Sequence, residues 1–247
     1  MSTTENFISH LIELRRRLLN SMLAWVLVFL CLFPFSRNLY SLLAQPLLTR
    51  LPKGGQMIAT GVTTPFFVPM KVAMMAALLV ALPYILYQIW RFVAPGLYEH
   101  EKRMVLPLIA ASTMLFFCGM AFAYFVVFPV VFGFITASAP EGVMVMTDID
   151  KYLSFALGMF VAFGMAFQVP VAVPMLARMG VVSIAKLKEI RPYMVVGAFV
   201  AGGVFMPPDV VSQFMLAIPL IVLYELGIIV SRWMLAASPA AAKPDAQ

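Results

Sequence analysis

The chain has 247 residues, of which 63% are hydrophobic and only 11% charged, and its mean hydropathy is +0.97. Soluble globular domains are about 45–50% apolar and about 25% charged. So much apolar surface does not fit into one soluble core of this length, which excludes a soluble domain and indicates that most of it faces lipid. The net charge of +6 lies beside the apolar runs, which favours membrane orientation over nucleic-acid binding.

Six apolar runs are candidates for transmembrane helices, each of which needs about 20 residues to cross a hydrocarbon core of about 30 Å. The sequence predicts an all-α integral membrane protein with spans at residues 18–36, 70–93, 104–128, 153–177, 193–206 and 212–231. Helices five and six are predicted to be short and to form a tight hairpin. At about 1.5 Å per residue, the fifth reaches only about 21 Å, so the bilayer must thin there or neighbouring helices must shelter it.

The N-terminal segment is predicted to be a helix of a different kind. Apolar side chains recur there at spacings of four, three and four residues, at Phe7, Leu11, Leu14 and Leu18. This stripe is typical of an amphipathic helix at the membrane interface, and we expect it over residues 5–17, leading into the first span. Residues 1–233 then form a single domain of six helices, and the tail 234–247, which is poor in large apolar residues, is expected to be disordered.

Lysine and arginine residues set the expected orientation. One face of the membrane would hold twelve, at positions 15–17, 91, 102, 103, 178, 186, 188, 191, 232 and 243. The other would hold five, at positions 37, 50, 53, 71 and 151, although it has the two longest loops. Because basic residues accumulate on the cytoplasmic side, both termini are predicted to be cytoplasmic. Lys71, at the start of the second span, is expected to snorkel to the outer interface.

Few side chains are suited to catalysis or metal binding. Cys31 and Cys118 lie inside apolar runs, and His10 and His100 lie outside the spans. No motif with two or more histidine or cysteine ligands can be drawn, and a serine hydrolase would have no base within the membrane. No Gly-rich phosphate loop follows a strand. The sequence therefore predicts a protein that is not an enzyme, with no cofactor, no metal and no nucleic-acid partner.

Two polar side chains lie in the middle of predicted spans, where they must face protein or water. Glu225, in LYELGII, could serve a proton relay or a hydrogen bond between helices. We favour the hydrogen bond, because no second carboxylate accompanies Glu225 at mid-membrane. Gln168, in FGMAFQVP, offers donors and an acceptor to a polar patch.

Carboxylates on the basic face have two interpretations. Glu13 can pair with Arg16 or Arg17, three or four residues further along a helix. The loop PGLYEHEKR at 95–103 carries Glu99 and Glu101, which can simply be solvated acids at the positive start of the third helix. Alternatively, carboxylates at one membrane face can bind a cationic ligand, and arginine suits this role because its planar fork bonds a carboxylate bidentately.

Seven stretches of the sequence carry a resemblance to a known family. They are HLIELRRRLLN at 10–20, PFFVPMK at 65–71, YQIWRFVAPGLYEHEKR at 87–103, GMAFAYFVVFP at 119–129, APEGV with TDI at 139–149, RPYMVVGAFV at 191–200 and MPPDVVSQ at 206–213. In this order they resemble the TatC family of twin-arginine translocase proteins, also called Sec-independent protein translocases. The matching stretches extend over most of residues 10–233.

The resemblance implies a function in protein export. Members form the core of a receptor for twin-arginine signal peptides on folded precursor proteins, together with a single-span partner of the B type. The receptor recruits single-span A-type subunits and self-associates, and export is driven by the proton-motive force. The resemblance thus implies a multi-pass protein of the bacterial inner membrane.

The resemblance also implies roles for particular residues. The family's signal-peptide-binding acids fall on Glu13 and Glu101, and neighbouring functional positions fall on Arg15, Phe92 and Arg103. Positions sensitive to change fall on Pro46 and Asp209, and Gln168 and Glu225 are further candidates for a structural or transport role. Many members have a glutamate where this chain has Gln168, so a carboxylate charge at that site is not essential here.

Three other classes of membrane protein are less well supported. A small-solute permease would be expected to have a polar midplane site and an internal repeat, and no repeat is evident. An intramembrane hydrolase would need a histidine or a pair of acids within the spans. A passive scaffold for other membrane subunits overlaps with a receptor core, which must also bind partners.

Overall fold

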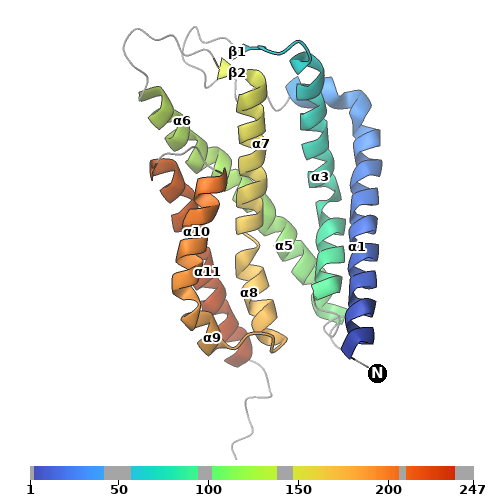
Figure 1. The fold of residues 1–247 in the computed structure, drawn as a ribbon, viewed down its shortest axis with the longest axis vertical. Helices are drawn as coiled ribbons and strands as arrows, with labels where there is room; N and C mark the ends of the chain where they lie inside the picture. The colour runs from blue at the N-terminus through green and yellow to red at the C-terminus, as the bar shows by residue number, and fades with distance from the viewer. Residues whose placement is uncertain (1–2, 42–56, 94–101, 138–146, 206–209, 237–247) are drawn as a thin grey trace, which may run out of the picture. The chain divides into compact units, whose positions relative to one another are not determined.

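The computed structural model describes residues 3–41, 57–93, 102–137, 147–205 and 210–236 of the chain (Figure 1). Its elements are almost all helical: α1 Thr3–Leu32, a 3-10 turn at Phe33–Phe35, α3 Thr64–Val93, α5 Lys102–Phe122, a π-helical turn at Ala123–Val127, α6 Phe128–Ala137, α7 Ile149–Ala166, α8 Val169–Arg178, α9 Ile184–Glu189, α10 Arg191–Phe205 and α11 Val210–Ala236. Two short strands, β1 Met57–Ile58 and β2 Thr147–Asp148, pair in parallel.

Five helical stretches of the described chain are long and apolar enough to cross a membrane. They are Ile8–Ser41, Thr64–Val93, Val105–Phe134, Ile149–Arg178 and Val210–Ala236. The fifth predicted span corresponds to α10, which has 15 residues and is shorter than these. The sixth was also predicted to be short, and this is wrong: it is α11, a helix of 27 residues, because the helix extends beyond the apolar run at both ends. The all-helical class predicted from the sequence is confirmed, apart from the two-residue strands.

Most of the predicted spans are longer in the structure. The amphipathic segment predicted at 5–17 and most of the first span form one helix, since α1 runs without a break from Thr3 to Leu32. The second span begins at Thr64 rather than at residue 70. The third continues through a π-helical turn into α6, which ends at Ala137. Hydropathy locates only the apolar run that can contact lipid, whereas the helices continue past the ends of these runs.

The fourth predicted span, 153–177, is broken into α7 and α8 at residues 167–168. Pro170 has no N–H to donate to the preceding turn, and the backbone N–H of Gln168 bonds Met165 O at 3.0 Å, three residues back. This tight turn is typical of a helix end. It leaves the Gln168 side chain at the break.

The chain divides into two compact units, and each is described here by itself. The first comprises Met1–Pro95 and Ile135–Gly158, and the second comprises Gly96–Phe134 and Met159–Gln247. In the first unit, α1 and α3 lie side by side and antiparallel (Figure 1). The indole N–H of Trp25 on α1 donates to the carbonyl of Met74 on α3 at 3.0 Å. This bond ties the C-terminal half of α1 to the N-terminal half of α3.

In the same unit, the N-terminal part of α7 packs against the N-terminal part of α3. Val68, Val72 and Leu153 form a buried cluster there. Beside it, Lys71 Nζ lies 2.6 Å from Asp150 Oδ1 and 2.9 Å from Ser154 Oγ. Lys71 was expected to snorkel to the outer interface, and the structure adds an ion pair with Asp150 at the start of α7.

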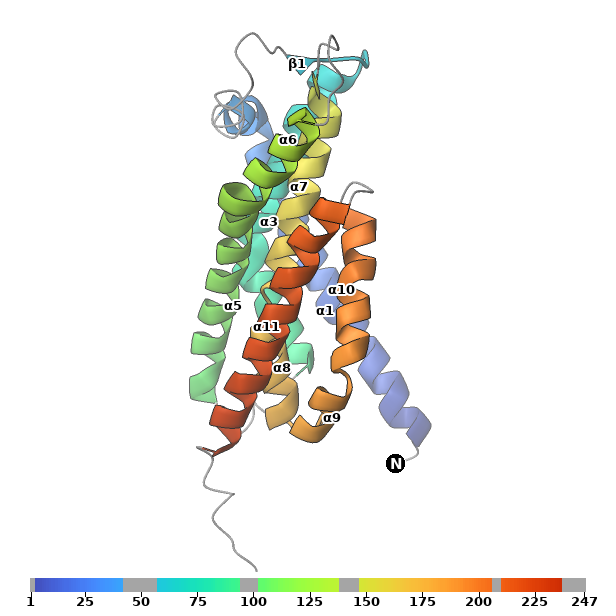
Figure 2. The same cartoon turned by 90° about the vertical axis from the view of Figure 1, so that its left-hand side faces the viewer.

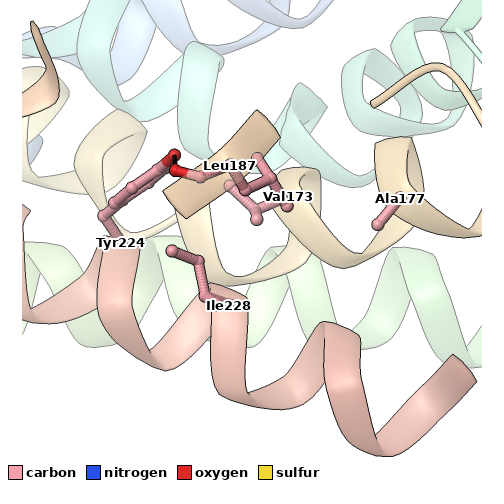
Figure 3. Packing of buried hydrophobic residues seen from close by; sticks show 5 residues of the cluster. All are labelled: Val173, Ala177, Leu187, Tyr224 and Ile228. Atoms are coloured by element: carbon pink, nitrogen blue, oxygen red, sulfur yellow. Dashed lines mark hydrogen bonds between the residues drawn. The ribbon is translucent and has the colours of Figure 1, made fainter. Parts of the chain in front are cut away.

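In the second unit, α8, α9, α10 and α11 form a packed group (Figure 2). Its core consists of Val173, Ala177, Leu187, Tyr224 and Ile228 (Figure 3). The Tyr224 hydroxyl donates to the carbonyl of Leu187 at 2.8 Å, which satisfies a buried polar group and ties α9 to α11. Aromatic side chains of α5, α6 and α7 form a further layer, including Phe122 against Phe163 and Phe128 against Phe160.

Candidate functional site

Glu13 and Arg17 form an ion pair on the N-terminal part of α1. Arg17 Nη2 lies 2.9 Å and Nε lies 3.3 Å from the same carboxylate oxygen, Oε1 of Glu13. Residues four apart share one face of a helix, so this pair follows directly from the sequence. It is one of the two pairings predicted for Glu13.

Arg17 also reaches across to α3. Its Nη1 donates to Gln88 Oε1 at 3.1 Å, and Gln88 Nε2 donates to the Tyr84 hydroxyl at 2.6 Å. Gln88 is only 4% exposed, so its amide would be costly to bury without these partners. The result is a chain of polar contacts, Glu13–Arg17–Gln88–Tyr84, that joins α1 to α3.

Aromatic contacts lie next to this chain. The rings of His10 on α1 and Phe92 on α3 are stacked, with centroids 4.4 Å apart and an interplanar angle of 20°. Arg91 Nη1 donates to the Tyr87 hydroxyl at 2.9 Å, and its guanidinium lies over the Tyr87 ring. Phe92, a residue predicted from the resemblance, is therefore brought close to the segment that carries Glu13.

The remaining predicted binding residues are placed only in part. Arg15 is exposed on α1, two residues from Glu13. Arg103 lies in the first turn of α5, and its side chain is outside the described part of the chain. Glu101 lies outside the described residues, as do Pro46 and Asp209.

The two mid-span polar residues both bond to another helix. Glu225 Oε2 accepts from Arg191 Nη2 at 2.6 Å, which is the predicted kind of contact between helices. Gln168 Nε2 donates to the carbonyl of Ser112 on α5 at 2.9 Å, while Gln168 Oε1 is buried and has no partner among the described residues. Each polar group thus fixes a helix contact within the second unit.

Sequence reasoning missed three partners in these networks. Gln88 and Tyr84 were not singled out, although a glutamine within an apolar run, four residues after a tyrosine, is a detectable signal. Arg191 was placed on the cytoplasmic face, just before the fifth predicted span, so it was not considered as the partner of Glu225. Within the described residues, no group of three or more His, Cys, Asp or Glu side chains could hold a metal ion.

The described structure defines a multi-pass helical membrane protein with a network of charged, amide and aromatic side chains between α1 and α3. A family model described as "Sec-independent protein translocase protein (TatC)" matches residues 9–219. The chain belongs to this family.

Known relatives match nearly the whole chain. It is 53% identical over 230 residues to the Sec-independent protein translocase protein TatC of Escherichia coli strain K12, covering 93% of this chain and 89% of the relative. It is 51% identical over 230 residues to TatC of Haemophilus influenzae strain KW20, covering 93% and 90%. A solved structure described as the twin-arginine translocase receptor TatC in DDM has a TM-score of 0.80 and 38% identity, covering 90% of this chain and 99% of that chain.

The family membership confirms the resemblance found in the sequence. This chain is a multi-pass membrane subunit of a bacterial protein translocase, a transport protein rather than an enzyme.

Proposed function

We propose that this chain is the receptor subunit that binds twin-arginine signal peptides at the cytoplasmic membrane face. The observation that supports it most is the polar chain through Glu13. The Glu13 carboxylate is held next to α3, and only its Oε1 is bonded by Arg17. Its side chain is 37% exposed, so a guanidinium from a peptide can reach it.

The chemistry of Glu13 fits an arginine ligand. A carboxylate and a guanidinium form charge-assisted hydrogen bonds in a planar, bidentate arrangement that an ammonium group does not reproduce. Hydrogen bonds to charged groups are worth about 1.5–3 kcal/mol. The stacked rings of His10 and Phe92 provide an apolar surface near the carboxylate. By the family resemblance, Glu101, Arg15 and Arg103 complete the site.

The membrane arrangement is part of the proposal. We assign six spans, with α10 as the short fifth span sheltered by α11, and both termini in the cytoplasm of a bacterial inner membrane. The twelve basic residues on one face against five on the other support this orientation. At about 1.5 Å per residue, the 15 residues of α10 reach about 22 Å, so the bilayer thins beside it.

The partners and the remaining residues are proposed from the resemblance. The chain would assemble with single-span A-type and B-type subunits and with further copies of itself, and would export folded precursors by using the proton-motive force. Pro46 and Asp209 are proposed to be sensitive to change. For Gln168 and Glu225 we propose a structural role, because each bonds a neighbouring helix.

A photocrosslinking experiment tests the site. A photoreactive residue at Ile12, which is 63% exposed and next to Glu13, leaves the carboxylate intact. In native membranes we expect it to crosslink a precursor carrying Arg-Arg and to crosslink a matched Lys-Lys precursor much less. Glu13→Gln should weaken the Arg-Arg crosslink to a similar extent.

Leu30 serves as the matched control position. It is 60% exposed on the same helix, but lies 18 residues further along α1, about 27 Å away at helical rise. No arginine-dependent crosslink is expected there. Equal crosslinking of both precursors at Ile12, in protein shown to be inserted, would reject Glu13 as the reader of the arginine pair.

A further inference from the structure

Glu13 is already bonded to an arginine of its own chain. Both Nε and Nη2 of Arg17 point at Oε1 of Glu13, at 3.3 and 2.9 Å. These are the donors that a peptide guanidinium would offer to the same carboxylate. Arg17 therefore occupies one of the two carboxylate oxygens with which Glu13 would bind a peptide arginine.

The two partners differ in how accessible they are. The Arg17 side chain is 17% exposed, whereas that of Glu13 is 37% exposed. The arginine thus lies toward α3 and the carboxylate lies toward the outside. A ligand that engages both carboxylate oxygens must take Oε1 from Arg17.

Gln88 gives Arg17 a second bond that does not depend on Glu13. Gln88 Oε1 accepts from Arg17 Nη1 at 3.1 Å, and the amide is fixed on its other side by the Tyr84 hydroxyl at 2.6 Å. When Glu13 turns to a ligand, Arg17 can keep this bond. Without Gln88, a displaced and largely buried guanidinium would lose its remaining described partner, which is costly.

We infer that Arg17 is an internal competitor for Glu13, so that signal-peptide binding exchanges one guanidinium for another while Gln88 retains the displaced Arg17. Arg17 then lowers the affinity for the peptide and keeps the carboxylate neutralised between binding events. Gln88 acts as a positioning residue that makes the exchange less costly. This inference rests on the proposed role of Glu13.

The exchange predicts opposite effects for the two residues. Arg17→Gln removes the competitor, so an Arg-Arg precursor should bind more tightly. Gln88→Met removes the bond that Arg17 keeps after displacement, so the same precursor should bind more weakly. A merely structural network would instead weaken binding in both variants, because either substitution breaks the link between α1 and α3.

The size of the effect can be bounded. An exposed ion pair at this spacing changes an equilibrium by about twofold, whereas a hydrogen bond to a charged group changes it by about tenfold or more. Arg17 is only 17% exposed and is anchored by Gln88. We therefore expect Arg17→Gln to tighten binding by about three- to tenfold.

Arg16→Gln is the matched control. Arg16 is exposed on α1, and its substitution removes the same charge one residue away. Any general loss of repulsion toward a cationic peptide is therefore common to both variants. The part of the gain that Arg17→Gln shows beyond Arg16→Gln measures the competition.

The experiment measures binding of a fluorescent Arg-Arg precursor to native membrane vesicles containing the full-length chain and its variants. We expect Arg17→Gln to bind several-fold more tightly than Arg16→Gln, Gln88→Met to bind more weakly than wild type, and the double variant to match Arg17→Gln. Equal affinities for Arg17→Gln and Arg16→Gln, or weaker binding by Arg17→Gln in folded protein, would overturn the inference. Glu13→Gln separates the two claims: unchanged binding there rejects the proposed site itself, whereas weakened binding leaves that site standing.

Discussion

Arg191, at the start of α10, donates a hydrogen bond of 2.6 Å to Glu225, which lies thirty-four residues later on α11. Close by, Tyr224 on α11 bonds the carbonyl of Leu187 on α9. Two consecutive residues of α11 thus bond the two short helices that precede it: Tyr224 bonds α9 and Glu225 bonds α10. The ion pair explains how a carboxylate is accommodated in the middle of an apolar helix.

Removing one member of this pair should destabilise the second unit. Glu225→Leu leaves the Arg191 charge without its described partner, and Arg191→Met does the same to Glu225. Breaking buried pairs costs about 3–5 kcal/mol, but the side chains of Arg191 and Glu225 are 42% and 39% exposed. We therefore expect a loss of about 1–2 kcal/mol in each case, measured by thermal unfolding in detergent.

The double variant, Arg191→Met with Glu225→Leu, provides the control. Because it removes both charges together, it should be more stable than the sum of the two single losses predicts. A coupling energy of at least about 0.5 kcal/mol is expected. Strict additivity would mean that the two side chains do not interact in the folded protein.

Gln168 allows a prediction that separates an amide from a carboxylate. Its Nε2 donates to the Ser112 carbonyl at 2.9 Å, which an ionised carboxylate cannot do. Gln168→Glu should therefore be less stable than wild type at pH 8. A protonated carboxyl group can donate to Ser112, so the folded protein favours the protonated form of the substituted side chain. The stability of this variant should rise as the pH falls from 8 to 5.

Gln168→Met is the control for this change, because it keeps the length of the side chain without charge or donor. Losing the bond to Ser112 should cost about 1 kcal/mol, with no dependence on pH between 8 and 5. Thermal unfolding of the three proteins across this range makes the comparison. Equal stability of Gln168→Glu and wild type at pH 8 would contradict the prediction.

A close backbone approach at Gly119 makes a third prediction. A Cβ atom there would lie 2.8 Å from the carbonyl carbon of Phe163 and closer still to its oxygen. Gly119→Ala should therefore force α5 away from α7 and cost about 1–3 kcal/mol. At Gly158, also within a helix, a Cβ would meet nothing within 4 Å, so Gly158→Ala should be neutral or slightly stabilising. Comparing the melting temperatures of the two variants tests this.

Local sequence patterns predicted much of this structure. The apolar runs located the long helices, because hydropathy depends only on neighbouring residues. The Glu13 pairing with Arg17 was one of two predicted choices, since residues four apart must share a face of a helix. The shortness of α10 was also evident from its sequence.

Tertiary partners were not predictable in the same way. No local spacing links Arg17 to Gln88, which lie 71 residues apart, or Lys71 to Asp150, which lie 79 apart. The apolar runs left Arg191 outside the predicted spans, although its side chain reaches Glu225 on another helix. Such contacts depend on how the helices pack, which a hydropathy pattern does not specify.

Asp148 connects the short strands to the start of α7. Its Oδ1 accepts from the backbone N–H groups of Asp150 at 2.7 Å and Lys151 at 3.2 Å, in the manner of a helix N-cap. Its Oδ2 accepts from the Thr60 hydroxyl and from the Thr60 N–H. The Thr60 hydroxyl, and to a lesser degree these backbone donors, lower the pKa of the Asp148 carboxyl below its ordinary value of 3.8.

The lowered pKa of Asp148 predicts a pH dependence confined to acid. A carboxylate with a lower pKa in the folded state stabilises the protein fully above its unfolded value, and this contribution is lost as the pH falls through the folded value. The melting temperature of wild type should therefore exceed that of Asp148→Asn by a constant margin above about pH 5, and the margin should shrink below the ordinary value of 3.8. Thr60→Val should show a smaller margin to Asp148→Asn at pH 7, because it removes the hydroxyl that donates to the carboxylate. A margin that stays unchanged down to pH 3 would show that the ionised form of Asp148 does not stabilise the fold.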